Sequence, residues 1–365
     1  MNSLGFDKSE KNTKVVVAMS GGVDSSVAAV KLKKEGYNVI GVTLKLYNQS
    51  DVSKSKSCCA GRDIDDAKQV ALHYDFPHYV YDYQDKFFDG VINNFVDSYA
   101  NAETPVPCIQ CNQTVKFTDL LNEAKNLNAD TLVTGHYAIR KGGLNSAKLY
   151  KALDQNKDQS YFLFATNQEQ LNYIRFPLGN FLKSEIRQLA LNYNLHVNDK
   201  PDSQDICFVT SKSYRDLINK IQPDLNKEGN ILDYNSNIIG KHKGIANYTI
   251  GQRKGLGIGG QEYPLYVTKI NKEQNYIVLG TEDKLQKSEI KFKNINWLGE
   301  NYNKQNLHCT AKIRSTQKEE SGILNINDDK GTFVFDKPIN STAPGQACVF
   351  YKKDRVLGGG WITAN

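Results

Sequence analysis

The sequence predicts an α/β fold: a doubly wound parallel sheet, followed by a small central domain and a C-terminal β-barrel. Two observations carry this prediction. The first part of the chain alternates apolar, strand-like runs with amphipathic, helix-like stretches at the spacing of βαβ units. After residue 210 the composition shifts towards Gly, Asn and Lys, and beyond residue 285 short alternating strands and turns follow one another. We therefore expect domains at 1–210, 211–283 and 284–365.

Strand-like and helix-like segments follow one another in order through the first domain. Apolar runs predict strands at 15–19, 38–47, 78–83 and 129–138. Helical periodicity predicts helices at 25–36, 63–74, 85–100 and 115–128. This alternation is typical of a parallel sheet with helices on both faces, which binds its ligands at the carboxyl ends of the strands.

Composition and charge restrict the class of protein. Hydrophobic residues make up 39% of the 365 residues and charged residues 24%, which is typical of a globular protein. The polar N-terminal segment has no signal-peptide pattern, and no apolar run reaches the roughly 20 residues of a membrane helix. We expect a cytoplasmic protein with no membrane or DNA partner. The net charge of +6 is compatible with binding RNA but does not require it.

The most specific local signal is the sequence SGGVDSS at 20–26, between a strand-like run and a helix-like stretch. Gly21 and Gly22 allow a polyanion to approach the backbone, and the helix adds the positive end of its dipole. Asp24 suits such a site if Mg²⁺ bridges its carboxylate to phosphates. A plain βα turn with a serine cap is the alternative. The segment resembles the PP-loop of the ATP pyrophosphatase superfamily, whose members split ATP between its α and β phosphates.

Seven cysteines raise the question of what their thiols do. Cys108 and Cys111 form a CxxC pair, but a structural zinc ion needs four ligands and no second matching pair exists. A thiol that carries sulfur as a persulfide needs a helix N-terminus or a cation nearby. Cys111 is expected just before the helix at 115–128, which suits this need, whereas nothing comparable is evident near Cys207. The remaining cysteines are expected to be loop or core thiols: Cys58, Cys59, Cys309 and Cys348.

An ordered set of motifs over nearly the whole chain resembles the bacterial tRNA-specific 2-thiouridylase family. The motifs are SGGVDSS, CNQTVKF (111–117), TGHYA (134–138), KDQSYFL (157–163), FPLG (176–179), PDSQDICF (201–208), YTIGQRKGLGI (248–258), APGQ and GGGWI. The resemblance implies a PP-loop domain, a small central domain and a C-terminal β-barrel, the last two in contact with tRNA. These parts agree with the composition shifts.

The resemblance also implies a reaction. In that family ATP, with Mg²⁺, adenylates the C2 oxygen of the wobble uridine, and a persulfide then attacks C2 to give 2-thiouridine and AMP. Cys207 would carry the persulfide, and Cys111 would close a disulfide with it to release the sulfur. The partners implied are tRNA and a persulfide sulfur-donor or relay protein. The sequence leaves open which tRNAs are modified, which protein donates sulfur, and the oligomeric state.

Carried over residue by residue, the family's contacts fall on two sets of positions. The ATP contacts are Ala18, Met19, Ser20, Gly21, Gly22, Val23, Asp24, Ser25, Leu44 and Gly135. The tRNA contacts are His136, Lys157, Asp158, Gln159, Arg314, Ser315 and Gln346. Basic side chains suit RNA phosphates, while Gln and His suit the edges of an extruded base.

One departure from the family pattern keeps alternatives open. Cys108 stands where the best-known members carry an aspartate. It is either a spare thiol or, together with Cys111 and Cys207, a ligand of a [4Fe-4S] cluster that runs the same reaction. A third alternative is a PP-loop ligase or amidotransferase acting on a small metabolite, which the large C-terminal part and the absence of a glutaminase domain disfavour.

Overall fold

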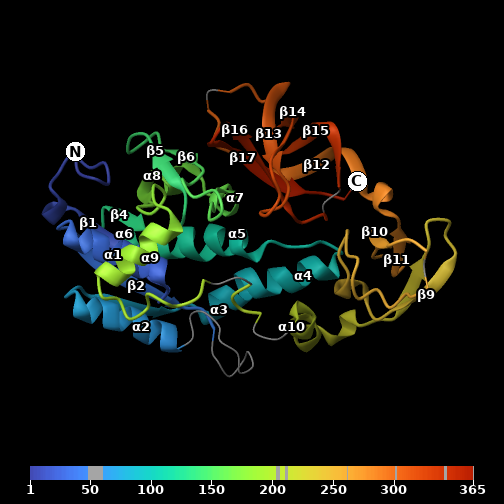
Figure 1. The fold of residues 1–365 in the computed structure, drawn as a ribbon, viewed down its shortest axis with the longest axis horizontal. Coiled ribbons are helices and arrows are strands. Elements are labelled where there is room, and N and C mark those ends of the chain that lie inside the picture. The colour runs from blue at the N-terminus through green and yellow to red at the C-terminus, as the bar shows by residue number, and fades with distance from the viewer. Residues whose placement is uncertain are drawn as a thin grey trace. The chain divides into compact units, whose positions relative to one another are not determined.

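A computed structural model describes residues 1–47, 61–202, 206–209, 213–260, 262–300, 302–340 and 343–364. The chain forms two compact units (Figure 1). Unit 1 consists of Met1–Val91, Cys108–Thr210 and Asp354–Leu357; unit 2 consists of Ile92–Pro107, Ser211–Lys353 and Gly358–Asn365. Cys58 and Cys59 lie outside the described residues.

Unit 1 contains a parallel sheet of five strands, which confirms the predicted fold class. The strand order is β3-β2-β1-β4-β7, so the chain starts in the middle of the sheet and winds outwards on both sides. The strands are β1 (Lys14–Ala18), β2 (Asn38–Lys45), β3 (His78–Asp82), β4 (Thr131–Val133) and β7 (Ile174–Arg175). In the central register, Val17 lies between Gly41 of β2 and Val133 of β4. β4 is therefore shorter than the predicted run at 129–138, because the chain leaves the sheet after Val133.

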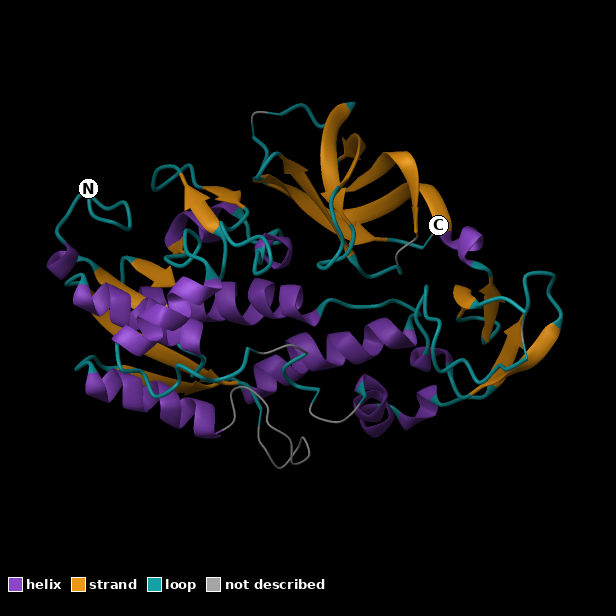
Figure 2. Cartoon of the chain, viewed as in Figure 1, coloured by secondary structure: helices purple, strands orange, loops and turns teal. Residues whose placement is uncertain are grey.

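Helices cover both faces of this sheet (Figure 2). One face carries α1 (Val23–Lys34), α2 (Gly61–His73) and α9 (Lys183–Asn192), whose buried residues share one core cluster with Val15, Val17 and Val133. α6 (Leu120–Asn126) contacts β1 and β4, but none of its residues joins that cluster, so it covers the opposite face. Unit 1 also contains η1 (Glu10–Asn12), α7 (Ser160–Leu163), α8 (Gln168–Tyr173), β5 (Ile139–Lys141) and β6 (Lys148–Tyr150).

Two long helical segments contain π-helical turns. The segment predicted at 85–100 is helical throughout, as α3 (Gln84–Phe87), η2 (Phe88–Asn93) and α4 (Asn94–Ala100). The second segment begins much earlier than predicted, as α5 (Pro107–Cys111), η3 (Asn112–Asp119) and α6. Pro107 starts this helix because proline's fixed φ suits a first turn, where its missing N–H costs nothing. The expectation that Cys111 precedes the helix is therefore wrong: Cys111 lies inside it.

Unit 2 contains a small four-stranded sheet and a closed barrel. The small sheet has the order β10-β11-β8-β9, from β8 (Gly229–Leu232), β9 (Ile238–His242), β10 (Tyr266–Asn271) and β11 (Tyr276–Gly280). The short helices near it are α10 (Tyr214–Ile221), η4 (Pro223–Leu225), η5 (Ile245–Asn247) and η6 (Glu282–Leu285).

The barrel confirms the predicted C-terminal architecture. Its strands follow the order β12-β15-β14-β13-β16-β17, and pairing of β12 with β17 closes the ring. They are β12 (Gln286–Trp297), β13 (Leu307–Lys312), β14 (Glu320–Asn327), β15 (Lys330–Asn340), β16 (Ala347–Lys352) and β17 (Arg355–Ile362). Cys309 and Cys348 are buried in it, as expected of core thiols. Among the described helices of both units, none is long and apolar enough to cross a membrane.

Candidate functional site

The SGGVDSS loop (Ser20–Ser26) follows β1 and continues into α1. Gly21 has a φ of +72°, a left-handed conformation that glycine adopts readily. A Cβ atom at Gly21 would lie 2.0 Å from the backbone oxygen of Asp63, and one at Gly135 would lie 2.9 Å from the backbone nitrogen of Ser25. Both positions therefore require glycine, because neighbouring backbone packs directly against the loop.

Hydrogen bonds within the loop leave several backbone donors available. The Ser20 N–H donates to Ser25 Oγ at 3.1 Å, and Ser25 Oγ lies 3.3 Å from the Gly22 oxygen. Within the described residues, the backbone N–H groups from Gly21 to Asp24 have no hydrogen-bond partner. Such a cluster of donors at the start of a helix suits the binding of phosphate.

Asp24 of the loop is held by two side chains from other elements. Lys183 Nζ donates to both carboxylate oxygens of Asp24 at 2.7 and 2.8 Å, and Tyr137 Oη donates to one of them at 2.8 Å. Burial, together with the charge of Asp24, raises the pKa of Tyr137 far above its usual value, so this hydroxyl stays a donor. The position predicted to bind Mg²⁺ thus has a lysine ammonium as its counter-ion.

Lys183 also connects Asp24 to a second carboxylate, that of Asp202. Lys183 Nζ lies 2.9 Å from Asp202, which also accepts from Lys157 at 2.7 Å and from Arg187 at 2.9 Å. Burial alone would raise the pKa of Asp202, but its hydrogen bonds and ion pairs with Lys157 and Lys183 lower it to about 2. This carboxylate is therefore ionised throughout the physiological range. Lys157, predicted to contact tRNA, is part of this network.

A third lysine, Lys200, holds the loop from its other side. Its Nζ donates to the Gly21 backbone oxygen at 2.9 Å and to the carboxylates of Asp63 and Asp66. Asp63 is buried and belongs to the first turn of α2. Lys200 therefore fixes one carbonyl group of the loop.

Cys111 lies buried inside the helix that begins at Pro107. Burial raises the pKa of its thiol, and the nearby Lys116 ammonium acts in the opposite direction. Cys108 is exposed one turn earlier, and Lys116 acts on its thiol in the same way. Lys116 also acts on His136, whose pKa is lowered to about 3, mainly by burial, so His136 is neutral. Lys116 is thus a cation near Cys111, but burial outweighs its effect and the pKa of the Cys111 thiol stays above its usual value.

Cys207 lies in a segment whose described residues contact Tyr47, which follows β2, and Phe87 of α3. Its backbone oxygen accepts a hydrogen bond from Tyr47 Oη at 3.1 Å, and the ring of Phe208 lies 5.7 Å from that of Phe87. Among the described residues, which include Cys108, Cys111 and Cys207, no group of three or more possible ligands is positioned to hold a metal ion.

The other predicted residues occupy varied positions. Ala18, Met19, Val23 and Leu44 belong to or adjoin β1, α1 and β2, and Met19 continues the pairing with Val42. Asp158 accepts from the backbone N–H groups of Ala152 and Ser160, and Gln159 bonds both backbone groups of Tyr137. In unit 2, Gln346 donates to the Thr104 oxygen at 2.9 Å, and Arg314 and Ser315 follow β13.

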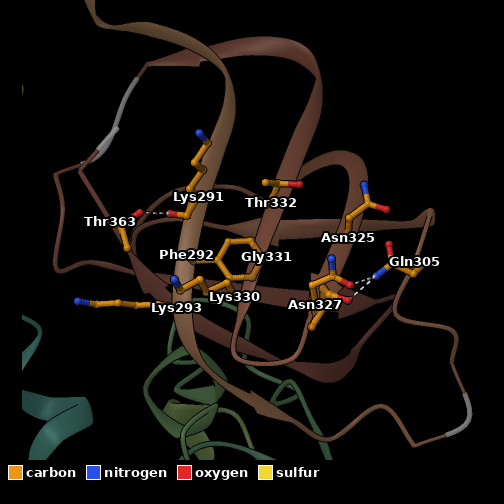
Figure 3. Close-up of a pocket in the computed structure, with 11 residues that line it drawn as sticks. Lys291, Phe292, Lys293, Gln305, Asn325, Asn327, Lys330, Gly331, Thr332 and Thr363 are labelled. Carbon is orange, nitrogen blue, oxygen red and sulfur yellow. Dashed lines mark hydrogen bonds between the residues drawn. The ribbon is translucent and has the colours of Figure 1, made fainter.

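The barrel of unit 2 has a pocket of about 460 Å³ on its surface (Figure 3). Lys291, Lys293 and Lys330 line it together with Gln305, Asn325, Asn327 and backbone, and none of the described lining residues is acidic. The three lysines are exposed and take part in none of the ion pairs formed by the described residues. Gly331 leaves room for the ring of Phe292, since a Cβ there would lie 2.5 Å from it.

Several residues of the site could not be found from local sequence. Lys183, Tyr137, Lys200 and Lys116 are ordinary side chains in helices and loops, and the pairs Lys183–Asp24 and Lys200–Asp63 span more than one hundred residues of chain. Tyr137 lies inside the motif TGHYA and Lys116 inside CNQTVKF, whereas Lys183 and Lys200 lie outside all of the quoted motifs.

A parallel sheet with a phosphate-binding loop after its central strand defines a nucleotide-binding α/β protein of the PP-loop class. Comparison with known proteins narrows this class. Three family models match in order: a tRNA methyl transferase HUP domain at residues 13–211, a PRC-barrel domain at 215–281, and an aminomethyltransferase β-barrel domain at 287–362.

Curated relatives match almost the whole chain. A tRNA-specific 2-thiouridylase MnmA from Dinoroseobacter shibae is 50% identical over 99% of this chain and 96% of its own length. The protein of the same name from Rickettsia prowazekii is 52% identical over 96% of this chain and 99% of its own length, and that from Orientia tsutsugamushi is 49% identical over 98% of both. The chain belongs to the tRNA-specific 2-thiouridylase family.

Proposed function

We propose that this protein is a cytoplasmic sulfurtransferase that uses ATP to convert the wobble uridine of tRNA to 2-thiouridine. One observation carries the proposal beyond family membership: unit 1 alone contains both a loop built to bind phosphate and the cysteines Cys111 and Cys207. A reaction that activates a carbonyl oxygen with ATP and replaces it with sulfur needs both parts.

The first step is adenylation. The uridine C2 oxygen attacks the α-phosphorus of ATP, and pyrophosphate leaves. The backbone donors of the SGGVDSS loop bind phosphate oxygens, while Lys183, 10% exposed and beside Asp24, supplies a positive charge for the departing pyrophosphate.

Mg²⁺ would enter this site with ATP. A protein usually holds Mg²⁺ with one or two carboxylates plus substrate phosphates, so the single carboxylate of Asp24 fits this role. Asp24 would then pair with both the ion and Lys183. Bound there, the ion would neutralise the phosphate charge that develops on the pyrophosphate.

The second step transfers sulfur. A donor or relay protein first loads Cys207 as a persulfide. The terminal sulfur of this persulfide attacks C2, AMP leaves with the original oxygen, and the base is then joined to Cys207 through a disulfide. The Cys111 thiolate attacks the Cys207 sulfur, which releases 2-thiouridine and leaves a Cys111–Cys207 disulfide for an external thiol to reduce. Burial raises the pKa of the Cys111 thiol and the Lys116 ammonium opposes this rise in part, so Lys116 acts in favour of the thiolate that this step requires.

The same reaction through an iron–sulfur cluster is the alternative. Among the described residues, Cys108, Cys111 and Cys207 do not form a group of three ligands placed to hold a metal ion. We therefore favour the persulfide route. A brown protein after anaerobic purification, whose colour is lost in Cys108→Ser, would instead support the cluster.

The central test is nucleoside mass spectrometry of tRNA incubated with the protein, ATP and a persulfide donor. We expect 2-thiouridine with wild type and with Cys108→Ser, and none with Cys207→Ser. The proposal would be overturned if the wild-type protein gave no 2-thiouridine but converted ATP to AMP with another substrate. That result would favour a different PP-loop reaction.

Contact between tRNA and the barrel is part of the proposal. The pocket lined by Lys291, Lys293 and Lys330 supports it, because these exposed lysines pair with no carboxylate among the described residues and so suit the phosphates of an RNA backbone. The predicted contacts at Arg314, Ser315 and Gln346 belong to the same unit.

A further inference from the structure

Lys200 has no role in the reaction described so far, yet its ammonium group has three well-placed acceptors. They are the backbone oxygen of Gly21 at 2.9 Å, the buried carboxylate of Asp63, and the carboxylate of Asp66 at 2.6 Å. A lysine ammonium has three N–H donors, so this arrangement uses all of them. The two carboxylates hold the ammonium in place, and its remaining donor points at the SGGVDSS loop.

The acceptor in the loop is a single carbonyl group, and its orientation determines that of the next N–H. The peptide unit that joins Gly21 to Gly22 is planar and trans, so its C=O and N–H bonds point in opposite directions. When Lys200 holds the Gly21 oxygen on one side, the Gly22 N–H faces the other side. That N–H is one of the loop donors without a partner among the described residues.

This peptide would be free to turn without such a restraint. Gly21, at a φ of +72°, has no side chain, and glycine adopts positive and negative φ angles almost equally. Rotation of the peptide would point a carbonyl oxygen, instead of an N–H, towards a bound phosphate. Electrostatic repulsion between that oxygen and the phosphate would then weaken binding.

We propose that Lys200 is a positioning residue, which orients the Gly21–Gly22 peptide so that the Gly22 N–H faces the phosphates of ATP. The proposal rests on the assignment of the SGGVDSS loop as the ATP site. Asp63 and Asp66 act through Lys200, because they fix the ammonium that fixes the carbonyl. Burial by itself would lower the pKa of Lys200, but the hydrogen bonds and charges of Asp63 and Asp66 raise it overall, so the ammonium remains charged.

The test compares two ligands that differ only in their phosphates. We expect Lys200→Met to weaken binding of α,β-methylene-ATP about tenfold or more, since a hydrogen bond to a charged donor is removed. Adenosine, which lacks phosphates, should bind the variant as it binds wild type. Lys200→Arg keeps a charged donor and should restore much of the affinity. Lys86→Met is the matched control, because the ion pair of Lys86 is with Asp119 of η3 and not with a residue of the loop.

The outcomes separate this inference from the proposed function. Equal weakening of both ligands in Lys200→Met would mean a general structural role and would overturn the inference, as would unchanged binding of the ATP analogue. A wild-type protein that binds no ATP analogue would overturn the ATP site itself. The KM for ATP should rise in the variant while the KM for tRNA stays unchanged, and an equal rise of both would contradict a phosphate-specific role.

Discussion

The lysines of the two units differ in what they contact. In unit 1, Lys157, Lys183 and Lys200 each contact one or two carboxylates at 2.9 Å or less, and these contacts surround the SGGVDSS loop. In unit 2, Lys291, Lys293 and Lys330 line a pocket with no acidic neighbour among its described lining residues. Lysines therefore serve two purposes in this protein. In unit 1 their charge fixes the geometry of a loop, and in unit 2 it remains available to a polyanion.

The largest effect is expected from Lys183→Met. This change leaves Asp24 and Asp202 without the ammonium that joins them, in a place where Lys183 is only 10% exposed. Loss of one partner of a largely buried ion pair costs about 3–5 kcal/mol, so stability should fall strongly. Formation of AMP from ATP in the presence of tRNA should fall by about 100-fold or more. Thermal unfolding and AMP release measure the two effects.

Asp24→Asn in the Lys183→Met background is the control for that prediction. Removal of the Asp24 charge should recover part of the lost stability, because one unpaired buried charge destabilises the fold more than the absence of both charges. The effect of Asp24→Asn on stability is measured in wild type and in Lys183→Met. If Asp24→Asn lowered stability equally in both backgrounds, the two residues would not be coupled.

Asp202→Asn should have a smaller, pH-dependent effect. The pKa of Asp202 is lowered from 3.8 to about 2, so this carboxylate stabilises the fold by roughly 2 kcal/mol above pH 4. Because the folded-state pKa is the lower one, this contribution is lost as the pH falls from 4 to 2. Denaturant titrations should show a stability gap between wild type and variant at pH 7 that closes by about pH 2. A gap of constant size would contradict the ion-pair account.

Replacement of the barrel lysines should affect tRNA binding alone. In the triple variant of Lys291, Lys293 and Lys330 to Met, the affinity for tRNA should fall and depend less steeply on salt. The log–log slope should decrease by roughly 0.7–0.9 for each RNA phosphate that a lysine no longer neutralises. The KM for ATP and the melting temperature should stay near wild type. An unchanged salt slope would show that the pocket does not contact RNA.

The smallest effect is expected for a solvent-exposed pair on unit 2. Lys241 and Glu228 are each more than 60% exposed, and solvent screens such pairs so that they contribute little to stability. Lys241→Met should therefore change neither stability nor activity measurably. A large loss of stability or activity would mean that solvent exposure does not distinguish the lysines that fix structure from those whose charge is available to a ligand.

Prediction from sequence worked best where local patterns determine structure. The alternation of apolar runs located β1, β2 and β3 within two or three residues, because each is a continuous segment of strand-forming residues. The SGGVDSS motif located the turn from β1 into α1, because its glycines and the helix start are adjacent in sequence. The barrel followed from alternating apolar residues such as Cys309 and Ala311.

The errors and omissions have a common physical cause. The helix at Pro107 was placed too late because its first turns carry few of the regularly spaced apolar residues that mark the helix further on, and the position of Cys111 was wrong with it. The lysine partners of Asp24 and Gly21 were missed because they are Lys183 of α9 and Lys200, more than 150 residues away. Such contacts depend on tertiary packing, which local periodicity does not encode.

A single-turnover reaction tests the central claim most directly. Enzyme loaded with persulfide at Cys207 is mixed with ATP and tRNA without reductant, and AMP, 2-thiouridine and cysteine state are measured by mass spectrometry. We expect equal amounts of AMP and 2-thiouridine, together with a disulfide between Cys111 and Cys207. In Cys111→Ser, the tRNA should remain joined to Cys207. Release of 2-thiouridine without AMP, or undiminished release in Cys111→Ser, would contradict the account.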